Sequence, residues 1–92
     1  MASLKTRDII NNLGKKGFDV NNTRDHIWLN YLTPEGRKTM IRTKLSHGED
    51  SIGDPLISAM AKQTQLRKNE FINLVSCSMS REEYYSIVKD KC

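Results

Sequence analysis

The alternation of apolar and polar residues is clearest in two segments on either side of a turn. From Asp25 to Leu32 and from Arg37 to Leu45, apolar side chains recur at about every second position, as is typical of half-buried β-strands. The intervening Pro34-Glu35-Gly36 fits a three-residue hairpin loop. Pro34 presets a type I turn, and Gly36 can adopt the left-handed conformation that closes it. The sequence therefore predicts a β-hairpin.

The loop length determines which residues face each other across this hairpin. A three-residue loop pairs Thr33 with Arg37, Leu29 with Ile41 and Ile27 with Thr43. One face then belongs to a core and carries Ile27, Leu29, Tyr31, Thr39, Ile41 and Leu45. The other face carries His26, Trp28, Asn30, Lys38, Met40, Arg42 and Lys44. A shift by one residue would mix apolar and charged side chains on both faces, so the segregated register is favoured.

Helical patterns flank the hairpin on both sides. Apolar spacing predicts a helix over about 4–16 with Ser3 or Thr6 as its cap and Gly17 as its stop signal. A short strand over 18–20 and a turn over 21–23 follow.

Beyond a loop over 46–53, Asp54-Pro55 predicts a helix start with Asp54 as the capping residue. The apolar stripe of that helix consists of Leu56, Ile57, Met60 and Ala61. A further helix is predicted over about 68–75. Ser80 and Glu83 form a capping box that opens a last helix, on which at least one of Tyr84 and Tyr85 packs against the domain.

The order of one helix, three strands and further helices predicts an α+β domain, with helices on one face of a three-stranded antiparallel sheet. The length of 92 residues suits one small domain. No apolar run is long enough to span a bilayer and no apolar signal segment follows Met1, so we expect a cytoplasmic protein without membrane contact. Cys77 and Cys92 fit no zinc spacing and suit a reducing compartment.

Positive charge is concentrated in the first half of the chain. Up to Gly48 there are nine cations and four anions, whereas the remainder has six cations and seven anions. This asymmetry indicates a polyanion or an acidic protein as partner, although a merely solvated surface would have the same composition. No phosphate-binding glycine loop, HExxH motif or nucleophile elbow is present.

The two histidines and the single tryptophan are the main candidates for function. A neutral imidazole at His26 could take the proton of a ribose 2′-hydroxyl, whereas the alternative is a strand histidine that only forms hydrogen bonds. His47 could hold a phosphate, transfer a proton or simply form a turn. Trp28 could stack on an unpaired base or lie buried beneath the C-terminal helices. A metal site or cofactor is not expected.

With these residues noted, the chain resembles the HicA-type toxins, small ribonucleases of prokaryotic toxin–antitoxin pairs. The resemblance rests on Thr6-Arg7-Asp8-Ile9-Ile10, Lys16-Gly17-Phe18, Arg24-Asp25-His26-Ile27-Trp28, Ser46-His47-Gly48 and the segment from Leu66 to Phe71. It implies an α-β-β-β-α domain like that of double-stranded-RNA-binding proteins over 1–75. One or two short C-terminal helices, expected over 76–92, extend beyond the family pattern. The chain departs from the family at Arg24-Asp25, where members carry a small pair, and in its extension.

The resemblance also implies a function, namely metal-independent cleavage of mRNA with His26 as general acid or base, and a cognate antitoxin as partner. The expected RNA-binding residues are Arg24, Trp28, Asn30, Lys38, Arg42, Lys44 and His47. The extension would either cover the exposed sheet face or form a homodimer. The alternative function is a basic module that binds nucleic acid or a protein without catalysis.

Overall fold

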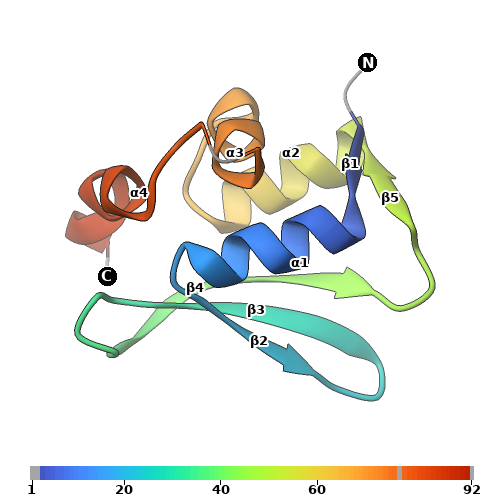
Figure 1. The fold of residues 1–92 in the computed structure, drawn as a ribbon, viewed down its shortest axis with the longest axis horizontal. Helices are drawn as coiled ribbons and strands as arrows, with labels where there is room; N and C mark the ends of the chain where they lie inside the picture. Colours follow the sequence, from blue (N-terminus) through green and yellow to red (C-terminus); the bar gives the residue numbers. More distant parts are fainter. Residues whose placement is uncertain (1–2, 77, 92) are drawn as a thin grey trace.

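A three-stranded antiparallel sheet and a layer of helices on one of its faces make up the fold, an α+β domain (Figure 1). The structure is a computed structural model that describes residues 3–76 and 78–91. Its elements are β1 (Ser3–Lys5), α1 (Thr6–Lys15), β2 (Phe18–Asn22), β3 (His26–Leu32), β4 (Lys38–Ser46), β5 (Ser51–Gly53), α2 (Asp54–Gln63), α3 (Lys68–Val75), α4 (Arg81–Val88) and the 3₁₀ turn η1 (Lys89–Lys91). The sheet has the order β2-β3-β4.

The first helix begins later than the apolar pattern predicts, because residues 3–5 form a strand. This strand, β1, pairs antiparallel with β5, and Leu4 lies opposite Ile52. The N-cap of α1 is Lys5, so the prediction of Ser3 or Thr6 as cap is wrong. Gly17 follows the end of the helix with φ of +106°, the left-handed conformation expected of a helix stop signal.

Strand β2 is longer than expected, and the turn after it lies further along the chain. The backbones of residues 21 and 22 pair with β3, so the predicted turn over 21–23 is wrong. The turn instead spans 23–25, where the Thr23 hydroxyl donates to the His26 carbonyl oxygen at 2.7 Å. The His26 amide in turn donates to Thr23 Oγ1 at 3.2 Å, so one threonine closes the turn in both directions.

The hairpin loop is the predicted one, but the pairing beyond it is not. The Thr33 amide donates to the Arg37 carbonyl oxygen at 2.9 Å, and Gly36 has φ of +85°. Further along, Leu29 lies opposite Thr43 rather than Ile41, and Ile27 lies opposite Leu45 rather than Thr43. The cause is a bulge in β4: residues 39–41 lie opposite Tyr31 alone, which shifts the register by two residues.

Thr39 forms two hydrogen bonds to the backbone at this bulge. Its hydroxyl donates to the Tyr31 carbonyl oxygen at 2.8 Å and accepts from the Ile41 amide at 3.1 Å. Because the shift is an even number of residues, every side chain keeps its predicted face. Leu29, Tyr31, Ile41 and Leu45 are buried, as the sequence predicts.

Because its hydroxyl forms two hydrogen bonds at the bulge, Thr39 should contribute to the free energy of unfolding. We expect Thr39→Val to lower the free energy of unfolding by about 1–2 kcal/mol, because the isosteric side chain can make neither hydrogen bond. Urea denaturation followed by Trp28 fluorescence measures this. Thr39→Ser keeps the hydroxyl and should cost less than Thr39→Val; equal losses would show that the hydroxyl has no role.

The helix over Asp54–Gln63 also differs in detail from its prediction. The N-cap is Gly53, whose backbone is extended, so Asp54 is not the capping residue. Asp54 instead forms an ion pair with Lys68 at 2.7 Å, linking α2 to α3. Three of the four stripe residues are buried, whereas Leu56 is 48% exposed. The capping box of Ser80 and Glu83 is confirmed, with both bonds at 3.1 Å.

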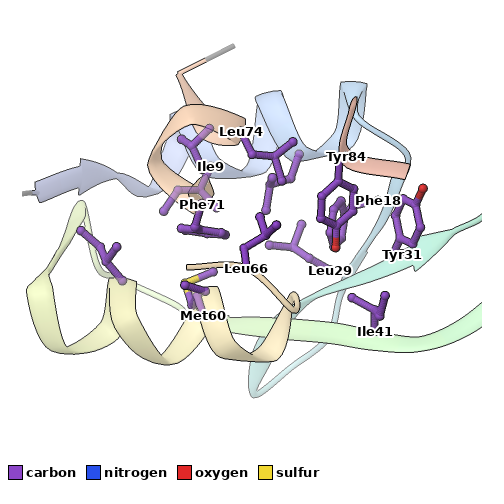
Figure 2. Packing of buried hydrophobic residues seen from close by; sticks show 14 of the residues in the cluster. Ile9, Phe18, Leu29, Tyr31, Ile41, Met60, Leu66, Phe71, Leu74 and Tyr84 are labelled. Carbon is purple, nitrogen blue, oxygen red and sulfur yellow. The ribbon is translucent and has the colours of Figure 1, made fainter. Parts of the chain in front are cut away.

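The C-terminal residues complete the core rather than covering the open side of the sheet. Tyr84 is fully buried, and its ring centroid lies 4.9 Å from that of Tyr31 and 5.6 Å from that of Phe18 (Figure 2). Its hydroxyl donates to the Thr64 carbonyl oxygen at 2.9 Å. Tyr85 is half-buried. The extension therefore packs on the helical side of the sheet.

Two polar side chains at the C-terminal end of α1 also contact the segment around the start of this extension. The buried ammonium group of Lys16 donates to the Met79 carbonyl oxygen. Asn12 Nδ2 donates to the Val75 carbonyl oxygen at 2.6 Å. The Lys16 hydrogen bond and the buried Tyr84 thus join residues 78–91 to the rest of the domain. No helix in the described part of the chain is both long and apolar enough to cross a membrane.

Candidate nucleic-acid interface

The sheet face opposite the helices is uncovered in the described structure and carries the candidate residues (Figure 1). We call this surface the open face. Because side chains alternate along each strand, it collects residues from all three strands. Its members are Asp19 and Asn21 of β2, His26, Trp28 and Asn30 of β3, and Lys38, Met40, Arg42 and Lys44 of β4.

Trp28 is the centre of a cluster of cations on the open face. The Arg42 guanidinium carbon lies 5.2 Å from the centroid of the Trp28 ring, and the Lys44 ammonium nitrogen lies 5.5 Å from it. Lys44 is directly across from Trp28 in the β3–β4 ladder, and Arg42 is the diagonal neighbour. The indole is half-exposed and the helices pack on the other face, so it is not buried beneath the C-terminal helices.

The three cations of β4 are available to an anionic ligand. Lys38, Arg42 and Lys44 are all exposed, and none of them forms an ion pair within residues 3–76 and 78–91. A groove of about 480 Å³ runs beside Lys38 and Arg42 on the open face. Its lining includes Asn30, Lys38, Met40 and Arg42, with Asp19 on the far strand. The groove thus combines cations, amides and an exposed thioether.

His26 lies at one end of the open face, beside the aromatic–cation cluster. Its ring centroid is 6.3 Å from that of Trp28, and the two rings are inclined by 63°. The imidazole is half-buried rather than enclosed, and it lines a cavity together with Lys44 and Glu49. Asp25, which precedes it, is exposed in the turn. A ligand on the open face can therefore reach the imidazole.

Arg24 and His47 lie in the two turns at this same end of the sheet. His26 pairs with Ser46, so the turns that precede His26 and follow Ser46 are neighbours. The His47 ring nitrogen Nε2 is 2.6 Å from the Thr23 carbonyl oxygen, to which it donates. His47 therefore links the two turns, which supports the turn alternative for this residue. The Arg24 side chain is exposed.

The described residues 3–76 and 78–91 bring no three His, Cys, Asp or Glu side chains together as a metal-binding group. Comparisons with family models, with curated proteins and with solved structures found no match. The functional argument for this chain therefore depends on its own residues.

Sequence reasoning missed Gln63, which lies at the end of α2 next to β4. Its Oε1 accepts a hydrogen bond from the buried Thr43 hydroxyl at 2.6 Å, and its side chain lines a cavity beside Trp28. No local pattern indicates this role, because it depends on a tertiary contact between residues 20 positions apart. Asn21 was missed because the predicted strand ended before it.

Proposed function

We propose that this protein binds single-stranded RNA on the open face and cleaves it without a metal ion, with His26 as the general base. The observation that carries the proposal is the grouping of Trp28, Arg42 and Lys44 on an uncovered sheet face with an accessible imidazole beside them. Flat sheet faces that combine aromatic rings and cations suit unpaired nucleotides, because bases stack on the rings and phosphates contact the cations.

The interaction energies favour replacement of one of the cations on the Trp28 ring by a nucleobase. An exposed cation–π contact contributes about 0.5–1 kcal/mol, whereas base stacking on an aromatic side chain contributes about 1–3 kcal/mol per base. A base can therefore displace one cation from the indole. The released guanidinium of Arg42 or ammonium of Lys44 is then free to contact the adjacent phosphate.

The chemical step uses a neutral imidazole at the edge of this surface. His26 removes the proton of a ribose 2′-hydroxyl, and the 2′-oxygen attacks the adjacent phosphorus. The bond from phosphorus to the 5′-oxygen breaks, and the leaving oxygen takes a proton from water. The products are a 2′,3′-cyclic phosphate and a 5′-hydroxyl. Lys44, which lines the same cavity as His26, would stabilise the developing charge on the phosphate oxygens.

The resemblance to HicA-type toxins supports the same function. The order of α1, the three-stranded sheet and the following helices agrees with a domain like that of double-stranded-RNA-binding proteins. On this proposal the protein is a toxin-like mRNA nuclease that a cognate antitoxin neutralises.

A nucleic-acid-binding module without catalysis is the second candidate function. It is favoured by the position of the aromatic–cation cluster, which accounts for RNA binding without any contribution from His26. The two candidates share the binding surface and differ only in whether the bound strand is cut.

The binding surface is tested by Trp28→Ala. We expect the affinity for a labelled, mixed-sequence single-stranded RNA to fall about 10–100-fold, because one base loses its stacking partner. Fluorescence anisotropy of the RNA measures the affinity, and the single tryptophan reports wild-type binding by quenching. Ile87→Ala is the control, since Ile87 is 38% exposed on α4, away from the open face. Equal affinities of the wild type and Trp28→Ala would contradict RNA binding here.

The two candidates are separated by incubating the wild-type protein with the same RNA in EDTA. Fragments that end in 2′,3′-cyclic phosphate support the nuclease, whereas bound but intact RNA supports the module without catalysis.

A further inference from the structure

A second cavity lies at the His26 end of the sheet, between the end of β4, β5 and α2. Its volume is about 140 Å³. Its apolar lining consists of Leu45, Ile52, Leu56, Ala59 and Met60. A protein cavity of about 150 Å³ with an apolar lining holds one benzene molecule. The available space therefore suits one six-membered ring and is small for the fused rings of a purine.

The polar groups of this cavity are a carboxylate and several hydrogen-bond donors. Glu49 supplies the carboxylate, whereas Lys44 and Gln63 supply donors. Because the Thr43 hydroxyl donates to Gln63 Oε1, the carboxamide is held with its Nε2 group as the remaining donor. The carboxylate repels a phosphate but accepts from an amino or imino group. The cavity is therefore suited to a neutral polar ring rather than to a phosphate.

This cavity is continuous with the aromatic–cation cluster through two shared residues. Lys44 lines the cavity and also lies 5.5 Å from the centroid of the Trp28 ring. His26 lines it as well, with its ring centroid 6.3 Å from that of Trp28. A strand with one base stacked on Trp28 therefore has a neighbouring base within reach of the cavity.

We propose that this cavity is a pyrimidine-binding pocket for the RNA base beside His26. The inference rests on the RNA binding proposed above and specifies which class of base is preferred at this position. Both pyrimidines present an N–H donor and acceptors on one edge: cytosine has its 4-amino group beside the acceptors N3 and O2, and uracil has N3–H between two carbonyl oxygens. The donor matches the Glu49 carboxylate, a pairing known for the cytosine amino group. A carbonyl oxygen of the ring matches Gln63 Nε2, whereas the Lys44 ammonium group, which also lies beside Trp28, remains for the phosphate.

Ala59 offers a way to fill the pocket without disturbing the core. It lines the cavity from α2, yet its side chain is exposed. Leucine at this position extends into the pocket, and its helix propensity is close to that of alanine. We expect wild-type protein to bind oligo(C) and oligo(U) about tenfold more tightly than oligo(A) of equal length. Ala59→Leu should remove this preference by weakening pyrimidine binding and leaving oligo(A) binding unchanged.

The matched control is Ser86→Leu, which adds the same side chain at an exposed position of α4. Its pyrimidine preference should equal that of the wild type. Equal wild-type affinity for the three oligonucleotides overturns the pocket while leaving RNA binding in place. A preference that survives in Ala59→Leu also overturns the pocket, because the base would then be recognised elsewhere. Absence of binding to every RNA overturns this inference together with the proposed function.

Discussion

RNA cleavage in EDTA should fall by a factor of about 10²–10⁴ when His26 is replaced by alanine, the range that one general base contributes. The substitution removes the group that takes the 2′-proton but leaves the aromatic–cation cluster on the open face. RNA affinity should therefore stay within about twofold of the wild type, since binding depends mainly on stacking and phosphate contacts. The rate is measured with a labelled single-stranded RNA at saturating protein concentration.

His47→Ala is the matched control, because it removes the other imidazole of the chain. The ring of His47 is occupied by the Thr23 carbonyl oxygen, so its loss should leave most of the cleavage rate. Circular dichroism checks that both variants fold. Cleavage by His26→Ala at the wild-type rate would exclude His26 as the general base and leave the binding module as the better description.

Replacement of Tyr84 by alanine should lower the free energy of unfolding by about 3–5 kcal/mol, as is usual for a buried aromatic side chain. The ring is fully buried beside Phe18 and Tyr31, and its loss leaves a cavity in the core. The total free energy of unfolding of a small domain is about 5–15 kcal/mol, so Tyr84→Ala should remove a large fraction of it. Urea denaturation followed by far-ultraviolet circular dichroism measures the change.

Two further variants show how much of this loss of stability comes from the Tyr84 hydroxyl group and how much is specific to Tyr84. Tyr84→Phe keeps the ring and loses only the hydrogen bond to the Thr64 carbonyl oxygen, so it should cost about 1–2 kcal/mol. Tyr85→Ala removes the neighbouring, half-buried tyrosine and should cost less than Tyr84→Ala. If Tyr84→Ala were no more destabilising than Tyr85→Ala, α4 would be an appendage rather than a part of the core.

Which side chains of the hairpin face the core could be predicted from the sequence, because side chains alternate between the two faces along a strand. Leu29 is buried and Arg42 is exposed, whatever even shift the pairing undergoes. The bulge itself could not be predicted, because its only distinguishing residue is Thr39, and threonine is common in regular strands. Likewise, β1 and β5 have three residues each, too few to show an alternating pattern.

The open face was predicted better than the pocket beside it. Trp28, Arg42 and Lys44 lie on adjacent strands of one hairpin, so local rules bring them together. Gln63 and Glu49 reach the His26 end of the sheet only through the packing of α2 and the turn before β5. Sequence spacing contains no information about such contacts between distant elements.

The two extra residues of β4 also limit how this hairpin can vary among related chains. Insertions or deletions in β4 that change its length by two residues would enlarge or remove the bulge and leave the tryptophan and its cations on one surface. A change by a single residue would turn those cations toward the core. Length variation in this strand should therefore occur in pairs, and a relative without the bulge could keep the same ligand-binding surface.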